Sequence, residues 1–220
     1  MTRKEEVVTT QAKICGLSEP LTLDAAVAGG AAYVGFVFFP KSPRNVAPDQ
    51  AAALAGRVPG HVGRVGVFVD PDDELVLRAV AAGRLDAIQL HGGESPARVV
   101  AVKALTGKQV WKAIPVRTGA DIDAAAAHAG AADLLLFDAK PPKGADLPGG
   151  LGLRFDWRLL AGYRTVSRWG LSGGLDASNV AQAIGITAAR LVDVSSGVES
   201  APGVKSVERI EAFLKAVKKA

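Results

Sequence analysis

Cys15 is the only cysteine in this 220-residue chain, and it ends a short apolar run, QAKIC, at residues 11–15. A thiolate can act as a nucleophile or as a general base, but an unperturbed thiol titrates near pH ~8.5, so either role needs help from the surrounding site. The alternative is that Cys15 packs as a small hydrophobic residue, as free cysteines commonly do. A single cysteine excludes an internal disulfide and a metal site built from several cysteines.

Other polar side chains also stand at or just after apolar runs. Asp138 ends the run LLLFD, where a carboxyl group can give a proton to a substrate, cap a helix or pair with a cation. Arg44 lies in the loop PKSPRN, where its guanidinium can bind a planar carboxylate or remain solvated. Gln89 and His91 belong to the segment QLHG and can contact a ligand or only line the rim of a site. The residues around His91 do not match a metal-ligand pattern, so we expect no metal ion.

Two segments rich in glycine and serine follow the last two apolar runs. The first includes Gly173 and Gly174, and the second includes Asp193, Ser195, Ser196 and Gly197. Such turns present backbone N–H groups that, with a following helix N-terminus, bind phosphate. Each segment could also be a tight turn that needs glycine for its backbone conformation. Because both follow consecutive runs near the C-terminus, together they favour a phosphate site.

The elements that must position these residues alternate along the chain. Short apolar runs predict eight strands at residues 11–15, 33–38, 63–69, 87–90, 109–114, 133–138, 165–172 and 190–195. Alanine-rich segments predict helices near residues 21–29, 48–56, 72–82, 95–106, 121–129, 156–161, 177–184 and 206–218. The acidic residues at 72–74 and the pair Ser95–Pro96 are typical of helix starts.

The strands read as continuous apolar runs, which is typical of parallel strands that are covered on both faces. Eight strand–helix units predict an α/β fold, a single-domain (β/α)8 TIM barrel over residues 11–220, with a doubly wound open sheet as the main alternative. We expect residues 1–10 to form a flexible polar arm without a chemical role. The longest irregular stretch, residues 139–155, is rich in glycine and proline and suits either a lid or a disordered loop.

In such a barrel, the loops that follow the strands meet at one rim, and catalytic groups gather there. Cys15 and Asp138 end strands on nearly opposite sides, so they could face each other across a bound substrate. One group could take a proton while the other gives one, which moves a hydrogen between carbon and oxygen without a cofactor. We therefore expect no cofactor.

The composition limits the classes of partner. The net charge of +4 is modest and the basic residues are scattered, whereas nucleic-acid binders more often carry a basic stripe with interleaved aromatics. No run of about 18 apolar residues is present, and the N-terminus lacks the apolar stretch of a signal peptide. We expect a cytoplasmic protein that binds a small phosphorylated molecule, with no nucleic-acid or membrane partner. The chain could be a monomer or a homodimer.

Seven segments in this order resemble the phosphoribosylanthranilate isomerases: KICG, SPR, QLHG, LLLFDA, FDW, LSGGL followed by NV, and DVSSGVE followed by PG. The resemblance extends from about residue 12 to the C-terminus. Two segments depart from the family pattern. A GGTG-like segment reads GGLG at residues 149–152, and HGDE reads HGGE, with Gly93 in place of an acid.

The resemblance implies the same barrel and a cofactor-independent Amadori rearrangement in tryptophan biosynthesis. In this reaction, N-(5-phosphoribosyl)anthranilate becomes 1-(2-carboxyphenylamino)-1-deoxyribulose 5-phosphate. The resemblance makes Asp138 the general acid that opens the ribose ring and Cys15 the general base that removes the C2 proton. Arg44 would hold the anthranilate carboxylate. The implied phosphate cradle is Gly173, Gly174, Ser195, Ser196 and Gly197, and the implied further pocket residues are Gln89, His91 and Asp193.

Two other functions stay open at this point. A sugar-phosphate isomerase of histidine biosynthesis, or a bifunctional enzyme, would share the fold but place an aspartate where Cys15 stands. A non-catalytic barrel that binds a phosphorylated ligand would keep the two glycine-rich loops and need no acid–base pair.

Overall fold

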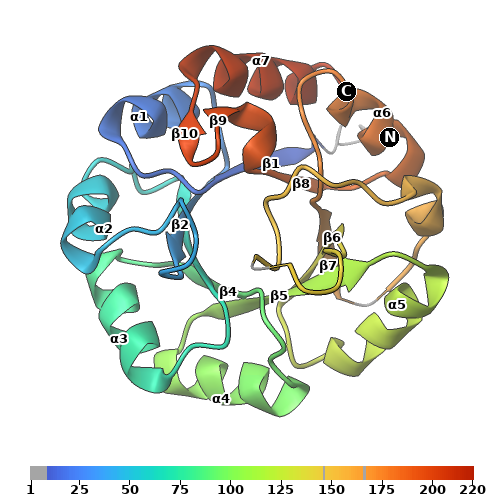
Figure 1. Cartoon of the computed structure of the whole chain (residues 1–220), viewed down its shortest axis with the longest axis horizontal. Coiled ribbons are helices and arrows are strands. Elements are labelled where there is room, and N and C mark those ends of the chain that lie inside the picture. The colour runs from blue at the N-terminus through green and yellow to red at the C-terminus, as the bar shows by residue number, and fades with distance from the viewer. Residues whose placement is uncertain (1–8, 146, 166) are drawn as a thin grey trace, which may run out of the picture.

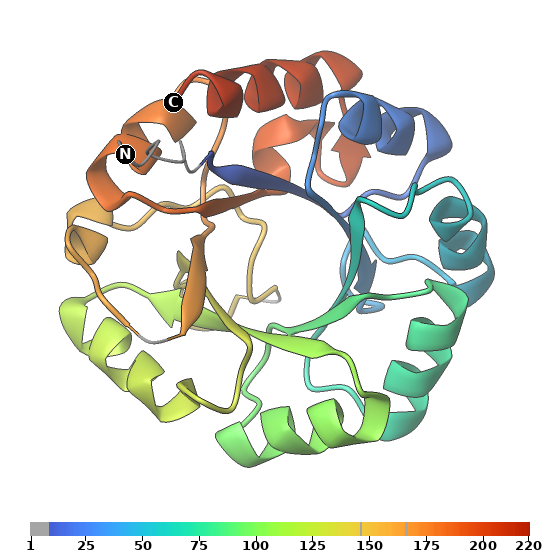
Figure 2. The ribbon, with the colours of Figure 1, turned by 180° about the vertical axis from the view of Figure 1, so that it is seen from behind.

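The structure is a computed structural model that describes residues 9–145, 147–165 and 167–220. Eight parallel strands close into a barrel in the order β1 to β8, and the helices form a ring outside it (Figures 1 and 2). Closure occurs because β1 pairs with β8 as well as with β2, for example Lys13 with Asp193. The (β/α)8 barrel is confirmed and the open sheet is excluded.

The element bounds lie close to those predicted. The strands are β1 (Gln11–Cys15), β2 (Tyr33–Phe38), β3 (Gly63–Phe68), β4 (Ala87–Leu90), β5 (Gln109–Val116), β6 (Leu134–Ala139), β7 (Arg168–Leu171) and β8 (Leu191–Val194). The helices are α1 (Pro20–Ala28), α2 (Pro48–Ala55), α3 (Asp73–Ala82), α4 (Pro96–Thr106), α5 (Gly119–Ala124), α6 (Val180–Thr187) and α7 (Val207–Lys218). Both predicted helix starts are confirmed: Ser95 is the predicted cap and accepts from the Arg98 N–H at 3.2 Å. Asp72, predicted in the first turn of its helix, is the N-cap and accepts from the Leu75 N–H at 2.7 Å.

Apolar side chains fill the interior of the barrel near the amino-terminal ends of its strands. An apolar layer on the inward faces of the strands includes Val65, Ala87, Trp111, Leu134 and Leu191, with Tyr33 packed edge-on against Trp111. A smaller group on the inward face, Cys15, Val37 and Val67, lies nearer the carboxyl ends of the strands. The side chains of the apolar layer fill the lower part of the barrel, so the interior opens toward the carboxyl-terminal ends of the strands, where this fold places its sites.

Two predicted helices are shorter than expected. Residues 121–129 form the end of α5 and a 3-10 turn, η1 (Ala125–His128), and residues 156–161 form only the 3-10 turn η2 (Trp157–Leu160). The second segment is short because Asp156 caps it at its start, and Gly162, with φ of 71°, follows its end. An α-helix needs more residues than this to repay its first turn.

An addition after β8 was not predicted. A 3-10 turn, η3 (Ser196–Val198), leads into a hairpin of β9 (Glu199–Ala201) and β10 (Val204–Lys205) before α7 begins. The hairpin lies over the barrel mouth beside α1 and α7 (Figure 1). Glu199 and Lys205 are register partners in this hairpin, so their side chains lie close together at the rim of the barrel.

Among the described residues, β7 and β8 are joined by fewer register pairs than any other two neighbouring strands of the barrel. Of the predicted strand at residues 165–172, residue 166 lies outside the described residues and Arg168–Leu171 form β7. Over the described ranges, a single pair, Leu171 with Val192, joins β7 to β8. By contrast, β5 and β6 are joined by six pairs.

The predicted N-terminal arm falls mostly outside the described residues, since residues 1–8 are not described. Thr10 is held, because its Oγ1 donates to the Ala189 carbonyl at 3.1 Å. None of the described helices is long and apolar enough to cross a membrane.

Candidate active site

A cavity opens at the carboxyl-terminal mouth of the barrel, where the predicted site residues gather. It is lined by Cys15, Arg44, Gln89, His91, Asp138, Gly173, Gly174, Asp193, Ser195 and Ser196. Part of the predicted loop at residues 139–155 also lines it, from Leu147 to Leu153, and this loop passes over the mouth (Figure 1). Of the predicted site residues, Gly197 alone does not line the cavity.

Asp138 sits on β6 at the end of a chain of polar contacts. Its Oδ1 accepts from the Ala139 N–H at 2.8 Å, and its Oδ2 lies 3.0 Å from His91 Nε2. His91 Nδ1 in turn lies 3.1 Å from Gln89 Nε2, and Gln89 is buried. Gln89 and His91 thus hold the carboxyl group of Asp138 in one orientation at the cavity wall.

The loop after β6 approaches this pair closely at Gly149. A Cβ at Gly149 would lie 2.8 Å from both Asp138 Oδ2 and His91 Nε2, which is too close for any side chain. Glycine is therefore required for the loop to lie against the carboxyl group. The GGLG segment keeps the glycine that this approach needs, despite its departure from the family pattern.

Cys15 ends β1 with its side chain in the barrel interior, above that of Lys13. Lys13 is fully buried, and its Nζ donates to Asp193 Oδ1 at 3.0 Å. Both side chains occupy the space that a side chain at Gly35 would take, since a Cβ there would lie 2.9 Å from Cys15 Sγ and 3.2 Å from Lys13 Nζ. Gly35 thereby allows the ammonium and the thiol to share one compartment.

The charges around Cys15 act in opposite directions on its thiol. Burial raises the pKa of Cys15 above its ordinary value, Lys13 opposes this rise, and Asp193 adds to it. Burial by itself would lower the pKa of Lys13, but Asp193 and Cys15 outweigh burial and raise it. Lys13 therefore stays cationic and favours the thiolate over the thiol.

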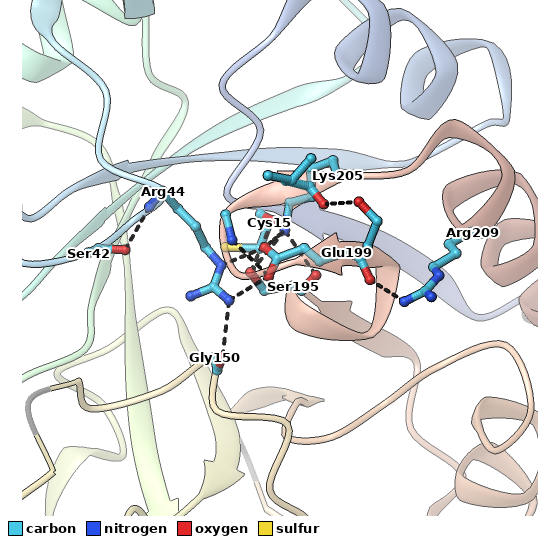
Figure 3. Close-up of polar contacts among 11 residues, drawn as sticks. Cys15, Ser42, Arg44, Gly150, Ser195, Glu199, Lys205 and Arg209 are labelled. Atoms are coloured by element: carbon cyan, nitrogen blue, oxygen red, sulfur yellow. Dashed lines mark hydrogen bonds and ion pairs between the residues drawn. The ribbon is translucent and has the colours of Figure 1, made fainter.

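Arg44 enters the cavity from the loop after β2 and is already paired. Its Nε donates to Glu199 Oε1 at 2.7 Å and its Nη2 to Glu199 Oε2 at 2.8 Å (Figure 3). Lys205 Nζ donates to the same Glu199 Oε1 at 2.7 Å. The carboxylate-binding residue predicted from sequence is thus part of an ion-pair network that sequence reasoning did not include.

The two glycine-rich loops meet on one side of the cavity. Gly173 and Gly174 have φ of 90° and 62°, the left-handed region that favours glycine. Within the part of the chain that the structure describes, the N–H groups of Gly173, Gly174 and Ser196 donate to no backbone carbonyl. These donors are available to an anion.

Gly197 connects these loops rather than facing the cavity. A Cβ at Gly197 would lie 1.9 Å from the Leu175 carbonyl oxygen, so only glycine allows the loop after β8 to pack against the loop after β7. The close contact fixes the separation of the two sets of N–H groups.

Three functional candidates were missed from sequence: Lys13, Glu199 and Lys205. Lys13 could have been found, because it precedes Cys15 by two residues on a strand and must share its face. Glu199 lies in the segment DVSSGVE, but its partner Arg44 is 155 residues away, and no local pattern links them. Lys205 carries no sequence signal, because the hairpin that holds it was not predicted.

Comparison with known proteins identifies the family of this chain. The family model described as N-(5'-phosphoribosyl)anthranilate (PRA) isomerase matches residues 12–216. A protein of Paracoccus denitrificans named N-(5'-phosphoribosyl)anthranilate isomerase is 58% identical over 202 residues, which are 92% of this chain and 94% of that protein. A protein of the same name from Rhodospirillum centenum is 57% identical over 93% of this chain and 96% of its own length.

Solved structures show the same likeness. The crystal structure of phosphoribosyl anthranilate isomerase from Thermotoga maritima has a TM-score of 0.87 and 36% identity, covering 96% of this chain and 100% of that one. A phosphoribosyl anthranilate isomerase in complex with reduced 1-(o-carboxyphenylamino)-1-deoxyribulose 5-phosphate has a TM-score of 0.84 and 35% identity over the same shares. On the family match and on these identities, the chain belongs to the N-(5'-phosphoribosyl)anthranilate isomerase family.

Proposed function

We propose that this chain rearranges N-(5'-phosphoribosyl)anthranilate to 1-(2-carboxyphenylamino)-1-deoxyribulose 5-phosphate, with Asp138 as general acid and Cys15 as general base. The observation that carries the proposal is that a thiol, a carboxyl group and two loops with open N–H donors line one cavity. A member of the same family has been crystallised with a reduced form of this product, which supports the assignment.

In the first step, Asp138 gives its proton to the ring oxygen of the ribose. The bond between C1 and the ring oxygen breaks, and the nitrogen lone pair forms a C=N bond, which leaves an open-chain iminium. His91 Nε2, 3.0 Å from Asp138 Oδ2, orients the carboxyl group. A carboxyl group that is held by two neighbours and faces the cavity is pre-organised for this transfer.

In the second step, the thiolate of Cys15 removes the proton from C2. The electron pair of that C–H bond forms a C1=C2 bond, and the C=N π electrons return to nitrogen, which gives an enolamine. The enolamine then tautomerises to the C2 ketone. The iminium accepts the electron pair, so the step is balanced without a metal or cofactor.

The charges of the site suit a substrate that is anionic at both ends. Arg44 binds the anthranilate carboxylate, and the phosphate lies on Gly173, Gly174, Ser195, Ser196 and the N-terminal side of Gly197. Asp193 is a further contact, because it lines the cavity beside Cys15. A guanidinium for the carboxylate and backbone N–H groups for the phosphate follow the usual preferences of these anions.

The experiment that tests the function follows the fluorescence of N-(5'-phosphoribosyl)anthranilate with the purified chain. We expect the fluorescence to fall, with the deoxyribulose phosphate as the product and no requirement for added metal. Binding of the substrate without turnover would instead favour a non-catalytic barrel. Turnover of the histidine-pathway aminoaldose would favour the bifunctional alternative.

The pKa of Cys15 gives a second test, because the chain has no other cysteine and thiol titration reports this residue alone. We expect Cys15 in the free protein to titrate above the ordinary range of ~8.5, since burial raises its pKa. Lys13→Met should raise the pKa further by removing the cation that favours the thiolate. Asp193→Asn should lower it by removing an anion that disfavours the thiolate.

Thiolate absorbance and the rate of alkylation against pH measure both shifts. If the two variants move the titration in the same direction, the electrostatic account of the base is wrong. Because the readout needs no turnover, this test is independent of the isomerase assay.

A further inference from the structure

Glu199 collects more hydrogen bonds than any role in the fold alone requires. Its two carboxylate oxygens accept from Arg44 Nε at 2.7 Å, Arg44 Nη2 at 2.8 Å, Lys205 Nζ at 2.7 Å and the Gly203 N–H at 3.2 Å. Figure 3 shows Glu199 with Arg44 on one side and Lys205 on the other. Every one of these contacts is donated to Glu199, so the position requires a group that only accepts.

The network of charged side chains is buried. Arg44 is 5%, Glu199 5% and Lys205 8% exposed. Two basic side chains share one carboxylate at the cavity wall, and burial lowers the pKa of Lys205 while Glu199 raises it. An ion pair in such surroundings is held in one geometry, because breaking it leaves a buried charge without a partner.

The pairing decides which part of Arg44 can reach a ligand. Nε and Nη2 face Glu199, and Nη2 also donates to the Gly150 carbonyl at 3.1 Å. Nη1 remains for the substrate. The loop after β6 approaches this end too, since a Cβ at Gly150 would lie 2.7 Å from Nη1.

Lys205 connects the same carboxylate to the other end of the site. Its Nζ donates to the Ser195 carbonyl at 2.9 Å and lies 3.2 Å from Ser195 Oγ, which donates to the Cys15 carbonyl at 3.2 Å. Glu199 therefore contacts the arginine directly, the phosphate loop through Lys205, and the strand end that carries the thiol through Lys205 and Ser195.

We propose that Glu199 is a positioning residue that fixes the guanidinium of Arg44 and thereby makes the site selective for substrates with a carboxylate on the aryl ring. The inference rests on the proposed function, since it takes Arg44 as the group that meets the anthranilate carboxylate. An amide at position 199 would turn one acceptor into a donor facing a donor, so Arg44 would swing away. Without the charge of Glu199, Arg44 would attract the aryl carboxylate more strongly. Hydrogen bonds weaken steeply with misalignment, however, so we expect the displacement of Arg44 to weaken carboxylate binding by more than this attraction strengthens it.

The test compares two stable analogues, made by reductive amination of ribose 5-phosphate with anthranilate or with aniline. They differ only in the aryl carboxylate, and their dissociation constants are measured by calorimetry. The wild-type protein should bind the carboxylated analogue roughly tenfold or more tightly than the other. Glu199→Gln should reduce this preference to about threefold or less, while its affinity for the aniline analogue changes little.

The matched control is Glu211→Gln, an exposed acid on α7 that keeps the wild-type preference. With the natural substrate, Glu199→Gln should raise KM much more than it lowers kcat, because the acid and the base are untouched. A Glu199→Gln protein with the full preference, or one that loses affinity for both analogues equally, would overturn the proposal.

A double variant separates positioning from stability. Glu199→Gln with Lys205→Met removes the buried cation that the single variant leaves unpaired, so its Tm should recover part of the loss. The carboxylate preference should stay low. Recovery of the preference together with the Tm would mean that Glu199 only balances the charge of Lys205, and the proposal would be wrong.

The outcome also separates this inference from the proposed function. If the wild-type protein binds both analogues equally, the assignment of Arg44 to the carboxylate is wrong as well. If the wild-type protein discriminates and Glu199→Gln discriminates equally, only the role of Glu199 is wrong.

Discussion

Cys15→Ala should lower kcat for the isomerisation by about 10³-fold or more, because it removes the base that takes the C2 proton. Alanine removes the sulfur without adding bulk, so the barrel should keep its fold. The measurement is the steady-state loss of substrate fluorescence, with enzyme concentrations high enough to detect slow turnover.

Cys15→Ser is the matched control for shape. A hydroxyl occupies nearly the same space but is a far weaker acid than a thiol, so little alkoxide forms beside Lys13. We expect the serine variant to be nearly as slow as the alanine variant. Both should bind the non-reacting carboxylated analogue within about threefold of wild type. Normal turnover by Cys15→Ala would refute the assignment of the base.

Asp138→Asn should lower kcat by about 10²- to 10⁴-fold, the range that a general acid contributes. Asparagine keeps the volume of the side chain but carries no transferable proton, so the ribose ring stays closed. Ring opening then limits the rate, and the base has no iminium to act on.

The control for Asp138→Asn is Asp123→Asn, an exposed acid on α5 that lies outside the cavity. It should match wild type in both kcat and KM. Affinity of Asp138→Asn for the carboxylated analogue should also stay near wild type, because the proposed anion contacts do not involve this carboxyl group. An Asp138→Asn enzyme with wild-type kcat would show that another group opens the ring.

The barrel could be predicted from sequence because short, mainly apolar runs alternate with helical segments along the chain, and polar residues stand at or after several of these runs. Cys15 closes β1 where the QAKIC run predicts it, and β6 ends one residue after Asp138. Polar groups at strand ends also predict a common site, since the fold itself brings those ends together.

The parts that could not be predicted depend on contacts between distant segments. The pairing of Arg44 with Glu199 joins the loop after β2 to a hairpin beyond β8, and sequence spacing contains no record of it. The neighbouring sequence also does not explain why position 197 is glycine. The reason is that a Cβ there would collide with the carbonyl oxygen of Leu175 in another loop. Residues 156–161 were predicted as a helix but form only the turn η2, which ends just before Gly162.

The single register pair between β7 and β8 has a consequence for how the barrel comes apart. Local thermal opening should begin between β7 and β8, because the fewest register pairs join these two strands. The contact of Gly197 with Leu175 joins the loops that follow these two strands, at their carboxyl-terminal ends. A phosphate bound by both loops would add a further connection between them. Substrate binding would therefore also stabilise the barrel where its strands are least connected.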